Sequence, residues 1–145
     1  IDRVLHDGEE VTFGGTTLVA HRTPGHTCGC TSWSMQLEEG GQTYSALIVC
    51  SFGVNANYVL VDNPNYPDIA DDYRATFAKA RAMPVDVFVA SHGSFYDLRT
   101  KYEALQRREL GEPNPFIDRA GFLAYVDLQE GRFQAILESQ RRDDR

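Results

Sequence analysis

The sequence is short of the features that mark several large classes of protein. Its 145 residues contain 14 lysines and arginines against 21 aspartates and glutamates, which gives a formal net charge of −7. Nucleic-acid-binding domains usually carry a basic face, so this balance argues against a nucleic-acid partner. The longest apolar runs, such as residues 85–90, fall far below the roughly 20 residues of a membrane-spanning helix. We therefore expect neither a nucleic-acid nor a membrane partner.

Several catalytic motifs are also missing. The sequence has no Gly-x-Ser-x-Gly around a serine nucleophile, no His-x-His and no His-Glu-x-x-His. It begins with Ile1 rather than Met and shows no charged-then-apolar leader. We therefore expect the chain to be a processed, truncated or excised part of a longer protein.

Cysteine is scarce, with only Cys28, Cys30 and Cys50. An odd number leaves at least one free thiol if a disulfide forms. Two cysteines separated by one residue are too close for an easy disulfide, so Cys50 is the natural partner for one of the other two. Buried free cysteines are the alternative.

What is present is sufficient for one ordinary domain, since 42% of the residues are hydrophobic. The pattern predicts a hairpin over residues 10–20, strands at 31–37, 43–50 and 85–90, and helices at 68–83, 95–109 and 115–141. This order predicts an α/β or α+β class, with helices packed on a sheet.

Helical spacing predicts which side chains face the core. In the first helix the predicted apolar stripe is Ile69, Tyr73, Phe77 and Ala80. The second helix is expected to turn Leu98, Tyr102 and Leu105 to one side. For the last helix, the inward positions are expected to be Phe116, Ala120, Leu123, Val126 or Asp127, Phe133, Ile136 and Leu137.

Two of the four histidines have a context that suits a metal ligand. His26 lies in a Pro-Gly turn after a strand, and His92 follows a buried strand and precedes Gly93. Imidazole is the commonest metal ligand at neutral pH, but catalytic zinc usually takes three protein ligands. The missing ligands must therefore come from elsewhere. We expect His6 to be exposed and His21 to be structural.

Five segments together resemble a known family. They are Thr23-Pro24-Gly25-His26-Thr27-x-Gly29, Asn63-Pro64-x-Tyr66-Pro67, Asp72-Tyr73-Arg74-x-x-Phe77, Asp86-Val87-Phe88-Val89-Ala90-Ser91-His92 and Asn114-Pro115-Phe116-Ile117-Asp118. The first resembles the third-histidine motif of the metallo-β-lactamase superfamily. The ordered set is similar to the third subclass of metallo-β-lactamases, whose zinc ligands are only His and Asp.

The resemblance implies that residues 1–145 form the C-terminal half of the αβ/βα metallo-β-lactamase sandwich. The family's His-x-His-x-Asp-His motif is expected upstream of Ile1, in an N-terminal half that is a possible partner. The complete enzyme would bind two Zn²⁺ ions. This chain would supply one ligand to each, and we expect the isolated chain to bind zinc poorly and to be inactive.

The resemblance also assigns individual residues. His26 matches the third histidine of the first zinc site, and His92 matches the last histidine of the second. Ser51 matches a serine that holds the substrate carboxylate. Tyr58 and Asn57 lie in the loop that flanks the substrate. Gly53 stands where some members carry a second serine.

Cys30 and Cys50 match positions that are disulfide-linked in some members of the family, which leaves Cys28 free. Such a bond would brace the strand that precedes Ser51 and stabilise the fold by roughly 3 kcal/mol. The alternative is Cys50 as a zinc thiolate, as in the other subclasses. A second family disulfide is absent, because Val85 stands at one of its positions.

Three functions are compatible with these observations. The first is zinc-dependent hydrolysis of the β-lactam amide by a periplasmic or secreted enzyme, through water activated by metal. The second is hydrolysis of a lactone or thioester by another member of the superfamily. The third is a non-catalytic fragment or binding domain. The sequence does not decide the preferred β-lactams or the oligomeric state.

Overall fold

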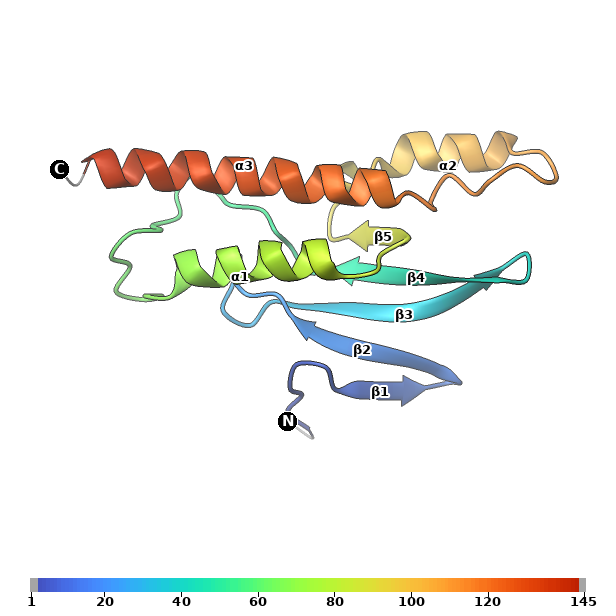
Figure 1. The fold of residues 1–145 in the computed structure, drawn as a ribbon, viewed down its shortest axis with the longest axis horizontal. Coiled ribbons are helices and arrows are strands. Elements are labelled where there is room, and N and C mark those ends of the chain that lie inside the picture. The colour runs from blue at the N-terminus through green and yellow to red at the C-terminus, as the bar shows by residue number, and fades with distance from the viewer. Residues whose placement is uncertain (1–2, 144–145) are drawn as a thin grey trace.

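A computed structural model describes residues 3–143 of the chain as a five-stranded sheet with helices packed on it (Figure 1). The strands are β1 (Glu10–Phe13), β2 (Thr16–Arg22), β3 (Thr31–Glu39), β4 (Gln42–Val49) and β5 (Val87–Ala90). The helices are α1 (Ile69–Ala82), the short 3₁₀ helix η1 (Gly93–Phe95), α2 (Leu98–Arg107) and α3 (Arg119–Asp143). The expected mixture of strands and helices is confirmed.

The sheet has the strand order β1-β2-β3-β4-β5. Neighbouring strands are antiparallel except β4 and β5, which are parallel and are joined by the crossover through α1. Strands β2, β4 and β5 therefore run in the same direction, and their carboxyl ends lie at one end of the sheet. The segments that follow these three strands are brought together there.

The core lies between one face of the sheet and helices α1 and α3. The predicted stripe of α1 is confirmed, since Ile69, Tyr73, Phe77 and Ala80 are all at most 4% exposed. These side chains pack with Leu47 and Val49 of β4, Phe88 of β5, and Phe122, Val126 and Phe133 of α3. Burial of this aromatic and aliphatic surface drives the docking of both helices.

The second predicted helix begins later than expected and faces differently. Asp97 has a left-handed φ of 55°, which separates η1 from α2, so the helix begins at Leu98 rather than at residue 95. Leu98 and Tyr102 are 40% and 55% exposed, and the buried member of α2 is Lys101. Its Nζ lies 2.8 Å from Asp118 Oδ2 and 5.2 Å from the centre of the Phe88 ring. This pairing allows the ammonium group to take the inward position.

The last predicted helix also begins late, at Arg119 rather than at residue 115. Ile117 instead forms a bridge with Val87 of β5, and the Asp118 amide donates to the Asp86 carbonyl at 2.8 Å. Asp118 Oδ1 accepts from the Gly121 amide at 2.7 Å, which caps the first turn of α3.

The predicted inward face of α3 is partly wrong. Ala120 is exposed, whereas Phe122 and Tyr125, which spacing from residue 115 leaves out, are buried. Val126 is buried and Asp127 is exposed, and the predicted burial of Phe133 and Leu137 is confirmed. The error follows from the misplaced start of the helix.

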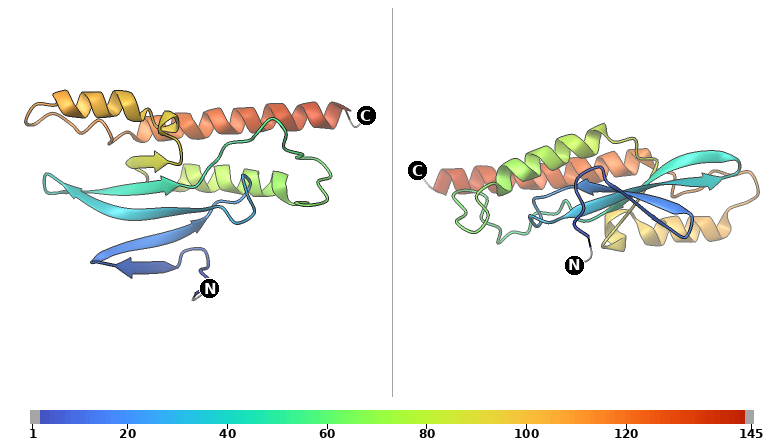
Figure 2. Two further views of the ribbon diagram at one scale, coloured as in Figure 1. Left: turned by 180° about the vertical axis from the view of Figure 1, so that it is seen from behind. Right: turned by 90° about the horizontal axis from the view of Figure 1, so that it is seen from below.

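The opposite face of the sheet carries no described helix over strands β1–β4, as the view from behind shows (Figure 2, left). On strands β2–β5 the pairing register places ten apolar side chains on this face: Leu18, Ala20, Trp33, Met35, Leu37, Tyr44, Ala46, Ile48, Val87 and Val89. Ile48 is 41% and Leu37 is 38% exposed. We call these ten residues the open sheet face. None of the helices within residues 3–143 is both long and apolar enough to cross a lipid bilayer.

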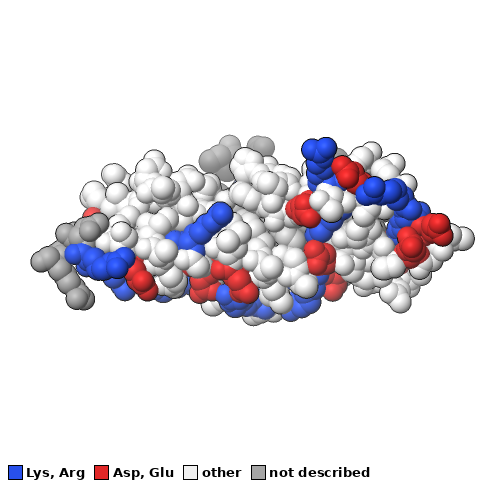
Figure 3. Space-filling model, turned by 90° about the horizontal axis from the view of Figure 1, so that it is seen from above, with Lys and Arg blue, Asp and Glu red and all other residues white. Residues whose placement is uncertain are grey.

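Charged side chains of both signs lie close together on the surface over α2 and α3 (Figure 3). Ion pairs join elements that are distant in the sequence. Arg108 pairs with Glu39 at 2.6 Å, and Arg81 of α1 pairs with Asp127 and Glu130 of α3. Exposed pairs of this kind contribute little to stability individually.

Candidate functional site

Three predicted site residues follow the three strands that end together. His26 comes four residues after β2, Ser51 two residues after β4, and His92 two residues after β5. Carboxyl ends of neighbouring strands are where functional groups collect in α/β folds. The topology therefore places all three residues at the same end of the sheet, although they are far apart in the sequence.

Helix α1 supports the loop that carries His26. Thr76 Oγ1 donates a hydrogen bond to the Pro24 carbonyl at 2.7 Å. Gly25 is buried with φ of +129°, and a Cβ atom at this position would lie 2.7 Å from the Tyr73 ring. Both the backbone conformation and the close approach of Tyr73 therefore require glycine here.

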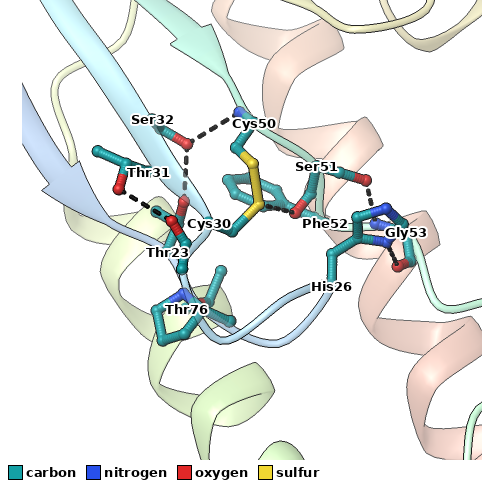
Figure 4. Close-up of a disulfide and its surroundings, with 12 residues drawn as sticks. Thr23, His26, Cys30, Thr31, Ser32, Cys50, Ser51, Phe52, Gly53 and Thr76 are labelled. Carbon is teal, nitrogen blue, oxygen red and sulfur yellow. Dashed lines mark hydrogen bonds between the residues drawn. A yellow bond between two sulfur atoms is a disulfide. The ribbon is translucent and has the colours of Figure 1, made fainter. Parts of the chain in front are cut away.

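The His26 ring is held by a backbone carbonyl. Its Nδ1 lies 2.8 Å from the Gly53 carbonyl oxygen (Figure 4). Because a carbonyl oxygen only accepts, Nδ1 carries the proton of this bond, and Nε2 of the neutral ring keeps its lone pair for a metal. Tyr58 donates from its hydroxyl to the His26 backbone carbonyl at 2.9 Å. The structure thus places Tyr58 beside His26.

Ser51 is only 6% exposed and lies beside the His26 support. Its Oγ accepts a hydrogen bond from the Gly53 amide at 3.2 Å (Figure 4). Since this bond uses only a lone pair, the hydroxyl proton of Ser51 remains available for donation. Asn57 is exposed in the turn that precedes Tyr58, so the structure does not draw it into this cluster.

The Cys30–Cys50 disulfide is confirmed, with a Cα–Cα distance of 5.8 Å (Figure 4). It joins the end of the His26 loop to the residue before Ser51. Because a disulfide sulfur is not a thiolate, the alternative of Cys50 as a zinc ligand does not fit this structure. Cys28 is a free, exposed cysteine.

Polar contacts continue around the disulfide. The Thr23 amide donates to the Cys30 carbonyl at 2.9 Å, and the Cys50 amide donates to Ser32 Oγ at 3.1 Å. The hydroxyl groups of Thr23 and Ser32, both 0% exposed, lie 2.8 Å apart. These bonds satisfy buried polar groups beside the site.

The remaining histidines differ from His26. His92 is exposed, and its ring meets the edge of Phe95 with 5.0 Å between ring centres. His21 Nε2 lies 2.7 Å from Ser34 Oγ, and burial is the main cause that lowers the pKa of its ring. His6 is exposed. Within residues 3–143, no three His, Cys, Asp or Glu side chains gather in an arrangement suited to a metal ion.

Two tyrosine hydroxyls that reach residues 52–53 from helices α1 and α3 are not revealed by the sequence pattern. Helical spacing predicts Tyr73 as a core position, and the structure shows in addition that its hydroxyl donates to the Gly53 carbonyl at 2.7 Å. Tyr125 lies outside the predicted core, and its hydroxyl accepts from the Phe52 amide at 3.3 Å. Burial raises the pKa of both phenols, which therefore stay protonated at neutral pH. A hydroxyl at the tip of a predicted core side chain is the one signal that points to such a role.

Solved structures show what this arrangement is similar to. The FEZ-1 metallo-β-lactamase from Legionella gormanii is 45% identical and superposes with a TM-score of 0.91 over 97% of this chain and 53% of its own. BJP-1, a subclass B3 metallo-β-lactamase of Bradyrhizobium japonicum, is 41% identical, with a TM-score of 0.88 over 100% of this chain and 53% of its own. The chain matches half of a subclass B3 metallo-β-lactamase.

The likeness extends to a metallo-β-lactamase of lower sequence identity. A metallo-β-lactamase from Cronobacter sakazakii is 37% identical, with a TM-score of 0.86 over 97% of this chain and 52% of its own. The chain thus spans about half the length of each metallo-β-lactamase that it matches. No protein-family model matches it. The five-stranded sheet and its helices correspond to half of the metallo-β-lactamase fold.

Proposed function

We propose that this chain is the C-terminal portion of a zinc-dependent enzyme that hydrolyses the β-lactam amide bond. The observation that carries the proposal is the held His26 ring, whose Nδ1 donates to Gly53 while Nε2 stays free. Likeness to subclass B3 metallo-β-lactamases at 41–45% identity supports the same function. The residues present fit zinc as part of a ligand set, because neutral imidazole is a preferred zinc ligand.

In this proposal His26 is a ligand of one zinc ion and His92 of the other. Bound zinc would supply an activated water and positive charge at the scissile amide. Ser51, with its hydroxyl proton available, would donate to the substrate carboxylate. Tyr58 and Asn57 would border the substrate, Tyr58 from beside His26 and Asn57 from the exposed turn.

We further propose that a preceding half-domain completes the site and supplies a His-x-His-x-Asp-His motif. Two observations support this part of the proposal. The chain spans about half of the metallo-β-lactamases that it matches, and its open sheet face presents ten apolar side chains. An apolar face that is only partly covered, with Leu37 and Ile48 exposed, favours contact with another element. In the αβ/βα sandwich expected for the complete enzyme, that element would be the sheet of the preceding half-domain.

A periplasmic or secreted location is part of the same proposal. Disulfides persist in oxidising compartments, and the Cys30–Cys50 bond is consistent with an extracytoplasmic location.

The decisive experiment uses the protein encoded by the complete reading frame that contains this chain. Its zinc content and its hydrolysis of a carbapenem are measured together with the variants His26→Ala, His92→Ala and His6→Ala. We expect two zinc ions in the parent protein, and loss of one ion and of activity in each of the first two variants. His6→Ala is the matched control, because His6 is exposed and remote in sequence from the site segments.

A second arm separates the proposed function from its alternative. The same protein is offered an acyl-lactone and a thioester. Hydrolysis of these without opening of any β-lactam would replace the proposal by another hydrolase activity. Absence of zinc and of every hydrolysis would leave a non-catalytic binding domain. An upstream sequence without the histidine motif would refute the proposed half-domain.

A further inference from the structure

We infer that Tyr73 is a positioning residue that fixes both the location and the tautomer of His26. The inference rests on the proposed role of His26 as a zinc ligand. Tyr73 itself is not proposed as a zinc ligand. It acts through two neighbours of His26, Gly53 and Gly25, from helix α1.

The first contact is a shared carbonyl oxygen. The Gly53 oxygen accepts from His26 Nδ1 at 2.8 Å and from the Tyr73 hydroxyl at 2.7 Å. A carbonyl oxygen has two lone pairs, so these two donors satisfy it completely. Gly53 lies outside any helix or strand and has no side chain to restrict its peptide plane. The Tyr73 hydroxyl is therefore the contact that fixes the direction in which this oxygen points.

The second contact is steric and involves Gly25. The Tyr73 ring stands against Gly25, where a Cβ atom would come within 2.7 Å of two ring atoms. Gly25 immediately precedes His26. The Tyr73 ring thus limits how closely the backbone before His26 can approach helix α1. The Tyr73 hydroxyl holds the carbonyl oxygen that accepts from the His26 ring.

Tyr73 is itself held firmly enough to act as a reference point. It is 0% exposed, and its ring centre lies 5.9 Å from that of Phe77 and 5.3 Å from that of Phe133. Side chains in such close-packed surroundings have little freedom to shift.

Loss of the hydroxyl alone has a defined consequence. In Tyr73→Phe the ring and its contact with Gly25 remain, but the Gly53 peptide loses one of its two restraints. The carbonyl then rotates more freely, and the His26 ring spends part of its time with the proton on Nε2. That tautomer has no lone pair at the nitrogen proposed to bind zinc.

The test compares Tyr73→Phe with Tyr125→Phe. Tyr125 is a matched control, because it is a buried phenol whose hydroxyl bonds the Phe52 amide, next to Gly53 but without contact to the His26 acceptor. Ring ¹⁵N chemical shifts of His26 are recorded in the metal-free full-length protein. Zinc affinity is then measured by competition with a chromophoric chelator.

We expect Tyr73→Phe to show a new Nε2-protonated population of His26 and about tenfold weaker zinc binding at one site. Tyr125→Phe should leave both unchanged. The inference is overturned if the His26 shifts of Tyr73→Phe equal those of the parent, or if both variants change them alike. Since the shifts are measured without metal, they decide the inference even if the protein binds no zinc, whereas absence of zinc would refute the proposed function.

Discussion

The Cys30–Cys50 disulfide yields a stability prediction with a calculable size. The bond closes a loop with a sequence separation of 20 residues. In the chain-entropy model, a loop of this length lowers the free energy of the folded state relative to the unfolded chain by about 3 kcal/mol. Replacing both cysteines by alanine, C30A/C50A, should therefore reduce the free energy of unfolding by that amount, roughly a hundredfold in the unfolding equilibrium.

Urea unfolding followed by fluorescence of Trp33, the one tryptophan of the chain, measures the effect. The free energy of unfolding of small domains falls by about 1–3 kcal/mol per molar urea, so the unfolding midpoint of the double variant should be lower by roughly 1–3 M. The parent protein treated with a thiol reductant should approach the double variant. Cys28→Ala is the control, because Cys28 is free and exposed, and it should change stability by less than about 0.5 kcal/mol.

Two results would contradict this reasoning. A double variant within about 1 kcal/mol of the parent would show that the denatured chain already holds these segments together, so that the bond removes little entropy. An equal loss in Cys28→Ala would show that the effect comes from substitution in this loop rather than from the disulfide.

Three further predictions concern packing and charge. Gly25→Ala should cost roughly 1–3 kcal/mol in unfolding free energy, because its Cβ meets the Tyr73 ring, whereas Gly29→Ala, with open space around it, should be nearly neutral by thermal unfolding. Lys101→Met should cost roughly 1–3 kcal/mol in urea, since it leaves the Asp118 carboxylate without its cation. Burial would raise the pKa of Asp118, but the bonds from Lys101 and the helix amide outweigh it and keep that pKa below 3.8. The ionised Asp118 carboxylate therefore contributes its full stabilisation above the pKa that this group has in the unfolded chain, and the contribution is lost as pH falls below about 4. The variant Asp118→Asn should lose less stability than the parent protein between pH 5 and pH 3. Equal stability profiles of the two proteins over this pH range would refute the prediction.

Much of this protein was predictable from local patterns. Helical spacing identified the buried stripe of α1, because an amphipathic helix must turn its apolar side to the core. The turn glycines and alternating strands located the hairpins, and the ordered set of sequence segments indicated a subclass that the comparisons support. These features depend on residues close together in the sequence, where backbone preferences and side-chain periodicity are sufficient.

Only the tertiary structure decided the features that depend on partners distant in the sequence. Lys101 takes the inward place on α2 because Asp118 and Phe88 receive its charge. The start of α3 is set by the pairing of Ile117 with Val87, which no helical pattern reveals. The His26 ring is held by Gly53, which lies 27 residues away in the sequence. Gly53 is in turn held by Tyr73, a further 20 residues along the chain. Such contacts are consequences of how the strands and helices pack, so the residue types predict the chemistry while the fold determines which atoms meet.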